Sequence, residues 1–352
     1  MKKIYLPLFA ALALAGCTQN EVGDNTTNAD NVELKLKSTA LAIDAGTRSP
    51  FEGEEGTATL PLEAKVLVKK QADDYTVLYN TADDKITFTD DGQTGFATTP
   101  YYYPADGTDL HLCGLYPYAV TGTGSGQWSL TATNAAFEFN GSHDVMAAAQ
   151  VATTKAQAQG GTYPTLAFAH LLTKLVIKVV ASEDAAITAW GNVTKIELVK
   201  AKGSAPNSKA TVTLATGTAL RTASAFSTVL NPFPFYAVTG GTTYTNTAFT
   251  GQTLALTTAS TAVAYSLVAP ILADGGSAAG TADFELRVYT EKAPVAGVDV
   301  PVGLLNSTPA AYAGETQGKA FEITLTFKSS GINAKASVTQ WMLDGTSSPE
   351  IK

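Results

Sequence analysis

The fold class of this chain is indicated most clearly by the stretch Ala320-Phe321-Glu322-Ile323-Thr324-Leu325-Thr326-Phe327-Lys328. Every second side chain in it is apolar: Phe321, Ile323, Leu325 and Phe327. This period of two is the pattern of a β-strand with one buried face. Further strands are predicted along the chain, among them 64–68, 76–79, 109–116, 166–180 and 284–291, and turn residues such as Ser329-Ser330-Gly331 separate such runs. The pattern predicts an all-β protein built from β-sandwiches.

The composition agrees with this fold class and excludes two classes of function. The 352 residues suggest about two domains. Charged residues make up only 15%, so threonine and other neutral polar residues must cover much of the surface, and threonine is well suited to strands. The net charge of −8 argues against a nucleic-acid partner and against electrostatic docking on an anionic membrane.

The N-terminus has the features of a lipoprotein signal peptide, which we assign to residues 1–16. Met1-Lys2-Lys3 is a positive start, and the apolar stretch 4–13 has the length of a signal-peptide core. Leu14-Ala15-Gly16-Cys17 then resembles the bacterial lipobox, which implies cleavage before Cys17 and acylation of its thiol. The residue after the cysteine is Thr18 rather than an aspartate, which resembles the pattern of lipoproteins sorted to the outer membrane. Each buried methylene of an acyl chain contributes about 0.8 kcal/mol, so several chains give a firm anchor.

Residues 17–48 are predicted to hold a lipidated tether followed by a strand. The polar tract 18–31 is typical of a flexible tether. Val32, Leu34 and Leu36 then alternate with charged residues, which predicts a strand over 32–43 with one buried face. A small polar loop follows, Asp44 to Pro50, and it carries Arg48.

No catalytic or metal site emerges from the residue patterns, and we predict no cofactor. Once Cys17 is acylated, Cys113 has no disulfide partner and is expected to be a small buried hydrophobe. The three histidines stand alone, without the paired spacing of a metal site. The acidic pairs, such as Asp73-Asp74, are interpreted as hairpin turns. Tyr101-Tyr102-Tyr103-Pro104 fits sugar stacking and a strand end before a proline turn equally well.

The tract 156–161, rich in Ala, Gln and Gly, is the most linker-like internal stretch. We therefore predict an N-terminal β-sandwich over 49–158 and a C-terminal β-sandwich over 159–352.

Several segments together resemble the fimbrillin (type V pilin) family, of the Mfa-like and FimA-like kind. They are the lipobox, the strand ending near Arg48, Tyr116-Pro117-Tyr118-Ala119, Asp144-Val145-Met146-Ala147-Ala148, the run from Leu166 to Leu175, and Ser337-Val338-Thr339-Gln340-Trp341. The resemblance implies two transthyretin-like Greek-key β-sandwich domains, exported as an outer-membrane lipoprotein. It also implies an arginine-specific protease that cuts between Arg48 and Ser49 and frees a groove for a strand of another subunit. Arg221 is the competing cleavage position, whereas Arg287 lies in a predicted strand and is expected to be protected by strand pairing. His170 matches a segment common in the family and is expected to be structural.

The physics of the N-terminal strand supports the same mechanism. Removing Val32, Leu34 and Leu36 exposes side chains whose burial contributes about 1.5–3 kcal/mol each, and it leaves ladder hydrogen bonds unpaired. A sandwich with such a slot is a template for strand addition. The C-terminal segment 333–343, with Val338 and Trp341, is a candidate donor strand, and the last strand of its own domain is the alternative.

Three functional hypotheses follow. The first is a structural fimbrial subunit that joins other subunits by strand exchange and supports adhesion. The second is an uncleaved outer-membrane lipoprotein, acting as a fimbrial anchor or as an adhesin for glycan or protein ligands on host or bacterial surfaces. An enzyme is the third, and it requires a site that the sequence does not reveal.

Overall fold

A computed structural model describes residues 31–40, 62–81, 84–88, 94–96, 98–118, 128–217, 226–278, 280–293, 295–305 and 311–339. Over these residues the regular structure consists of strands and two short helices, which confirms the all-β class. The described residues from Val32 onward belong to one compact unit.

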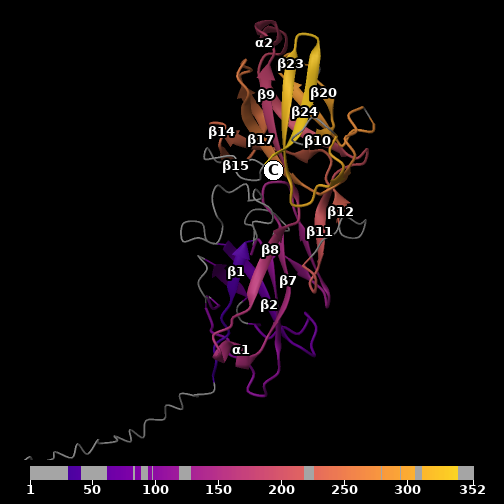
Figure 1. The fold of residues 1–352 in the computed structure, drawn as a ribbon. Coiled ribbons are helices and arrows are strands. Elements are labelled where there is room, and N and C mark those ends of the chain that lie inside the picture. Colours follow the sequence, from indigo (N-terminus) through magenta and orange to yellow (C-terminus); the bar gives the residue numbers. More distant parts are fainter. Residues whose placement is uncertain are drawn as a thin grey trace, which may run out of the picture. The chain divides into compact units, whose positions relative to one another are not determined.

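A six-stranded sheet contains the first strands of the chain (Figure 1). Its order is β1 (Lys37–Ala40), β8 (Thr165–His170), β7 (Met146–Thr153), β4 (Leu110–Tyr116), β2 (Leu62–Lys70) and β3 (Lys85–Phe88). β1 runs parallel to β8, and the other neighbours are antiparallel. Alternate residues of β2, such as Ala64 and Val66, are fully buried on one face in a core of their own.

A seven-stranded sheet contains the stretch that decided the fold class. Its order is β15 (Thr243–Ala248), β14 (Tyr236–Thr239), β17 (Thr261–Val268), β9 (Thr173–Ala181), β23 (Ala320–Lys328), β24 (Gly331–Thr339) and β21 (Leu304–Leu305). In Figure 1, β9, β23 and β24 lie side by side. Phe321, Ile323 and Leu325 of β23 are fully buried, as their alternation predicts.

Three further sheets complete the described structure. The first joins β13 (Phe233–Pro234), β10 (Val193–Ala201), β19 (Phe284–Thr290) and β20 (Val298–Val302), with β16 (Thr250–Leu254) on β10. The second joins β12 (Phe226–Val229), β11 (Asn207–Thr213), β6 (Asn134–Glu138) and β5 (Ser129–Leu130). A small pair joins β18 (Leu272–Ala273) and β22 (Gly314–Glu315).

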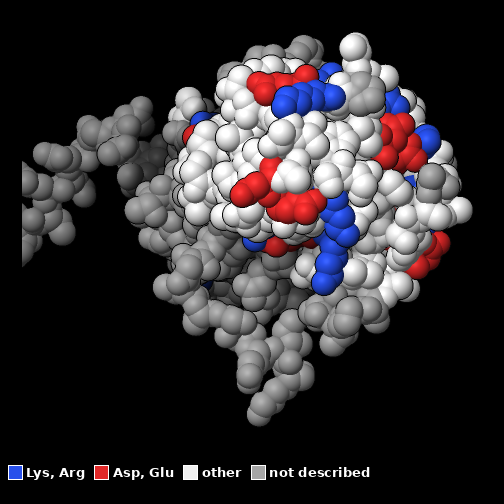
Figure 2. Space-filling view, turned by 90° about the horizontal axis from the view of Figure 1, so that it is seen from above, with Lys and Arg blue, Asp and Glu red and all other residues white. Residues whose placement is uncertain are grey.

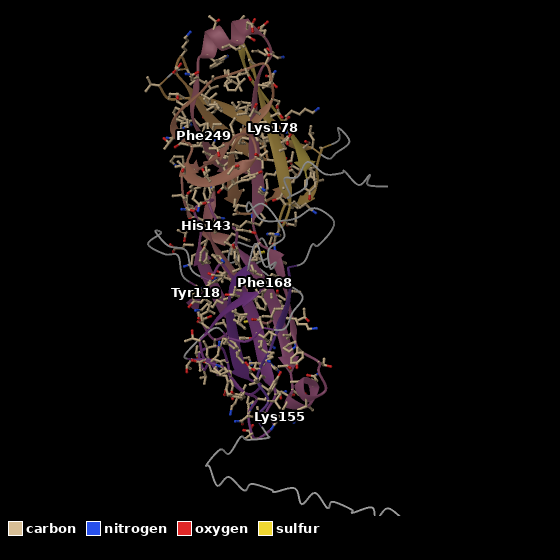
Figure 3. All side chains as sticks on the ribbon, turned by 90° about the vertical axis from the view of Figure 1, so that its left-hand side faces the viewer. Tyr118, His143, Lys155, Phe168, Lys178 and Phe249 are labelled. Atoms are coloured by element: carbon tan, nitrogen blue, oxygen red, sulfur yellow. The ribbon has the colours of Figure 1, made fainter. Side chains whose placement is uncertain are left out.

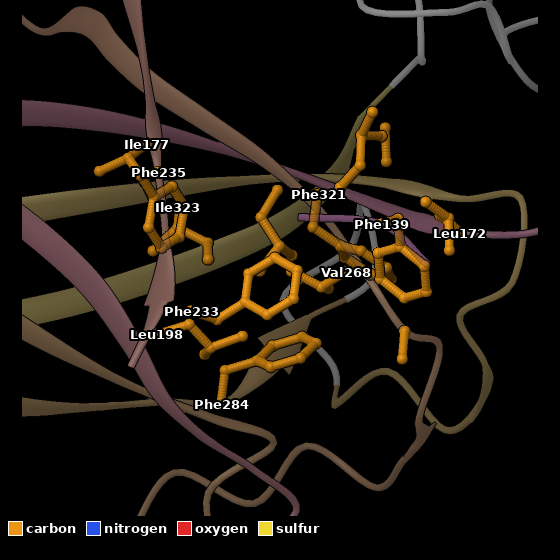
Figure 4. Close-up of a cluster of buried hydrophobic side chains, with 14 of the residues drawn as sticks. Phe139, Leu172, Ile177, Leu198, Phe233, Phe235, Val268, Phe284, Phe321 and Ile323 are labelled. Atoms are coloured by element: carbon orange, nitrogen blue, oxygen red, sulfur yellow. The ribbon is translucent and has the colours of Figure 1, made fainter. Parts of the chain in front are cut away.

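The largest apolar core draws on the facing sheets of the C-terminal half. Ile177 and Ile323 come from the seven-stranded sheet, and Leu198 and Phe284 come from the five-stranded sheet. Figure 4 shows these side chains in one cluster around Phe233. Two sheets that bury side chains against one another form a sandwich. The transthyretin-like Greek-key topology stays a prediction.

Three local predictions are wrong. Helix α1 (Lys155–Gln159) takes up most of the predicted linker at 156–161, because Thr154 and Gln157 make a capping box. A predicted strand at 76–79 is a turn region, where the Asp74 carboxylate accepts the Thr76 N–H. One long strand expected over 166–180 is broken at residues 171–172 into β8 and β9. Helix α2 (Asp184–Trp190) was not predicted.

The division of the chain at residue 158 also stays a prediction. Strands from both sides of that position share two sheets: β8 pairs with β7, and β11 pairs with β6.

Candidate functional site

Residues 32–40, which we call the N-terminal segment, make backbone contacts on two sides. Its second half is β1, and each residue of β1 pairs with one of β8, from Lys37 with Thr165 to Ala40 with Phe168. Its first half, Val32 to Leu36, makes isolated bridges on the other side, to Tyr102 and Thr94. The regular strand thus begins at Lys37, later than the predicted start at Val32, and the segment occupies a slot between two stretches of backbone.

The second wall of the slot is the strap, which we define as residues 94–96 and 98–103. The Leu34 N–H donates to the Tyr101 carbonyl over 2.7 Å, and the Tyr103 N–H donates to the Val32 carbonyl over 2.9 Å. Leu36 and Thr94 exchange two N–H to carbonyl bonds, each of 2.9 Å. Four backbone hydrogen bonds therefore join the strap to the segment.

The side chains of the segment alternate as predicted. Leu34 and Leu36 are both 0% exposed, and Val32 is half-buried against the same core. Full burial of two leucines contributes roughly 3–6 kcal/mol relative to exposure. The four backbone bonds to the strap contribute about 0.5–1.5 kcal/mol each, a similar total, so the leucine side chains and the backbone together hold the segment in the groove.

The groove that receives the leucines is the core of the six-stranded sheet. Phe88 of β3 and Phe168 of β8 meet edge to face there, with ring centroids 6.1 Å apart. Figure 3 labels Phe168 among the strands of this sheet. Gly114 of β4 makes room for that ring, because a Cβ at position 114 would lie 2.4 Å from Phe168 Cζ. β8 thus contributes both a backbone wall and an aromatic floor.

Charge contributes little to the groove. Glu33 and Lys35 alternate with the buried leucines and face one another at 3.4 Å, with more than a third of each side chain exposed. Such a surface pair contributes at most about 1 kcal/mol. Away from the groove, in the view of Figure 2 from the end that carries α2, lysines and arginines lie beside acidic residues on a mostly uncharged face, so that face has no basic patch for a polyanion.

A buried polar cluster lies at the far end of β8. His170 Nδ1 pairs with the carboxylate of Asp144, which is 0% exposed, so His170 is structural as expected. Lys174 of β9 is 2% exposed and lies over the Tyr244 ring, 4.3 Å from its centroid. Burial lowers the pKa of Lys174 to about 7, and the nearby negative charge of Asp144 opposes that shift.

The candidate donor strand is paired inside its own chain. β24 forms nine antiparallel residue pairs with β23 and two parallel pairs with β21. Ala336 is fully buried, and Val338 is half-buried against the large core. This arrangement matches the alternative in which the segment is the last strand of its own domain. Whether it is also donated stays a prediction.

Several predicted site residues lie outside the described residues: Cys17, Arg48, Ser49 and Trp341. Arg221, a competing cleavage position, lies outside them as well. Arg287 is described and lies in β19, which is paired on both sides. Its guanidinium forms two bonds of 2.6 and 2.9 Å with Asp299, so a protease must open the sheet to reach this arginine.

The described residues carry no other arrangement that indicates chemistry. No group of three or more His, Cys, Asp or Glu that could hold a metal ion occurs among them. Cys113 is fully buried, as expected, and burial raises the pKa of its thiol to about 12. Among the same residues, no helix is long and apolar enough to cross a membrane.

The pairing of the strap with the N-terminal segment was not predicted from the sequence. Of Tyr101-Tyr102-Tyr103, which we weighed as a sugar platform, Tyr103 is 3% exposed in the core and bonds Thr153 at 2.8 Å. Tyr101 packs against the same core, and Tyr102 is 40% exposed. The burial of Tyr103 and Tyr101 therefore favours the interpretation of these residues as a strand end over that of a sugar platform. Their backbone partner is the N-terminal segment, which the sequence did not indicate.

This chain matches one family model and has structural neighbours of low sequence identity. A family model described as fimbrillin-like matches residues 64–341. A search of curated proteins finds no match. Among solved structures, a candidate cell adhesion protein from Bacteroides uniformis is 16% identical, with a TM-score of 0.49, over 90% of this chain and 99% of that one. A fimbrial protein from Bacteroides vulgatus is 15% identical, with a TM-score of 0.44, over 88% of this chain and 99% of that one.

Proposed function

Because this chain belongs to the fimbrillin-like family, we propose that it is a fimbrial subunit that assembles by strand exchange. Family membership supports a structural or adhesive, non-enzymatic role in a fimbrium at the cell surface. The finer mechanism is our proposal: the N-terminal segment fills a groove, proteolysis removes the segment, and a strand of another subunit takes its place.

The observation that carries this proposal is the complete burial of Leu34 and Leu36 in a segment with separate backbone partners on each side. When the segment leaves, an apolar slot opens and both walls lose hydrogen-bond partners. An incoming strand with apolar side chains two residues apart restores both kinds of contact at once.

Processing supplies the switch. Before it, acylated Cys17 holds the precursor at the outer membrane, and the covalently attached segment fills the groove at high effective concentration. Cleavage after Arg48 makes Ser49 the new N-terminus and leaves the segment held by its contacts alone. The incoming strand is tethered to a whole subunit, and the C-terminal segment with Val338 and Trp341 is our candidate for it.

Limited digestion of the full chain by an arginine-specific protease tests this function. We expect cleavage after Arg48, a new N-terminus at Ser49, and polymerisation that follows cleavage. Arg48→Ala should abolish both events, and Arg221→Ala, the matched control at the competing site, should leave them unchanged. Polymerisation of Arg48→Ala at the native rate contradicts the proposal. Mass measurement of protein from shed fimbriae that finds acylated Cys17 favours the uncleaved anchor or adhesin.

A further inference from the structure

The strap is the less secure wall of the groove. β8 is bonded to β7 within the six-stranded sheet, whereas the strap faces the N-terminal segment across four backbone hydrogen bonds. When the segment leaves, Thr94 and Tyr103 lose the carbonyl partners of their N–H groups. A loop with exposed hydrogen-bonding groups opens at low free energy unless side chains hold it.

Tyr79 is attached rigidly to the sheet on the opposite side from the segment. Its N–H donates to the Val68 carbonyl of β2 over 2.7 Å. The next residue, Asn80, is 1% exposed and takes the place of a neighbouring strand: its side chain accepts the Val68 N–H over 2.9 Å and donates to the Val66 carbonyl over 2.7 Å. Residue 79 therefore has a fixed base.

From this base, Tyr79 reaches the strap. Its hydroxyl donates to the Tyr102 carbonyl over 2.7 Å, between the two strap residues that bond the segment, Tyr101 and Tyr103. The Tyr79 ring lies 6.3 Å from that of Tyr101, which meets Phe96 edge to face at 5.0 Å. Partial burial raises the pKa of Tyr79, so the hydroxyl stays protonated and able to donate at neutral pH.

We propose that Tyr79 is a positioning residue of the groove, whose hydroxyl bond to Tyr102 holds the strap one strand's width from β8. Its consequence for assembly rests on the proposed function, because a held strap keeps the emptied groove open for the incoming strand. Without this bond the strap keeps its anchor at Tyr103, which is buried and bonded to Thr153, but the position of Tyr102 and its neighbours relative to β8 is no longer fixed.

Amide hydrogen exchange on the intact full chain tests the proposal without any need for cleavage or assembly. In Tyr79→Phe, which keeps the ring, we expect the amides of Leu34, Thr94 and Tyr103 to exchange about three- to tenfold faster, the effect of losing one hydrogen bond. Amides of β2 and β4 should be unchanged, whereas a merely structural role would speed exchange across the sheet.

Tyr312→Phe is the matched control, because its hydroxyl also donates to a carbonyl over 2.7 Å, that of Glu315. It should leave the strap amides unchanged. Equal exchange of the strap amides in the native chain and Tyr79→Phe overturns the proposal, as does faster exchange spread over β2 and β4. Since this measurement uses uncleaved protein, a chain that fails to polymerise but shows the strap effect refutes the proposed function and leaves the positioning role intact.

Discussion

The N-terminal segment and strand β24 differ in how deeply their side chains are buried and in how their backbones are paired. The segment has two fully buried leucines, Leu34 and Leu36, four residue pairs with β8 and four backbone hydrogen bonds to the strap. β24 has nine residue pairs with β23, and Ala336 is the fully buried side chain among those described on it.

This difference determines what each element leaves behind. Loss of the segment opens an apolar hole in a core, which only matching side chains can fill. Loss of β24 leaves nine residues of β23 and two of β21 without their strand partner, and any extended backbone can pair with them. Under the proposed strand exchange, the groove is therefore the selective partner, and the strand that enters it must have matching side chains.

The largest effect should come from the side chains of the N-terminal segment. Leu34→Ala and Leu36→Ala should each lower the free energy of unfolding by about 2–5 kcal/mol, because each leaves a cavity in the core of the six-stranded sheet. The combined variant should lose about 4–8 kcal/mol, with some coupling between the adjacent sites. Urea unfolding followed by circular dichroism gives these values.

The matched control on the same segment is Lys35→Ala, whose side chain is 40% exposed and should change stability by less than about 0.5 kcal/mol. Losses below 1 kcal/mol for both leucine variants contradict the view that side chains hold the segment.

A smaller effect on the free energy of unfolding should come from Lys174 of β9, in the sheet that contains β24. The pKa of this lysine is about 7 when folded and near 10.4 when unfolded, so the unfolded chain binds more protons between these values. Stability should therefore rise with pH across this window and fall as pH drops toward 7. Lys174→Met should remove this dependence and stabilise the protein at pH 7 by up to about 4 kcal/mol.

The measurement is the difference in unfolding free energy between Lys174→Met and the native chain from pH 7 to 9.5. The difference cancels the opposite contribution of Cys113, whose pKa burial raises to about 12. A difference that stays constant with pH shows that Lys174 is protonated in the folded state. Lys178→Met, on the same strand with a half-exposed side chain paired to Glu322, should show no such trend.

The buried side chains and most long strands could be predicted from the sequence, because local patterns encode them. Alternation alone placed Leu34 and Leu36 in the core and identified β2, β4, β19 and β23, because a half-buried strand imposes a period of two. Helix α1 was also readable, since Thr154 and Gln157 have capping-box spacing, but the small residues around them favoured a linker.

Local patterns do not encode which strands pair with one another. The strap pairs with a segment about 60 residues earlier in the chain, and its stretch Thr98-Thr99-Pro100 reads as a turn. The hairpin of β14 and β15 was missed for another reason. β15 is mostly exposed, so its three threonines and Tyr244 show no alternation between buried and exposed positions. Non-local pairing and exposed strands require the three-dimensional structure.

The smallest effect should come from the side chains of β24. Val338 is half-buried, so Val338→Ala removes about half of a buried valine and should cost about 1 kcal/mol or less. Val338→Pro should cost about 3 kcal/mol or more, because proline lacks the backbone N–H and its ring is poorly tolerated in a strand that is paired on both sides. The same two substitutions at Leu36 should both be costly, since its side chain is fully buried and its backbone N–H donates to Thr94. Urea unfolding of the four variants gives the loss of unfolding free energy from the side chain and from the backbone at each site. If Val338→Ala costs as much as Leu36→Ala, buried side chains hold both elements and the contrast between the N-terminal segment and β24 is wrong.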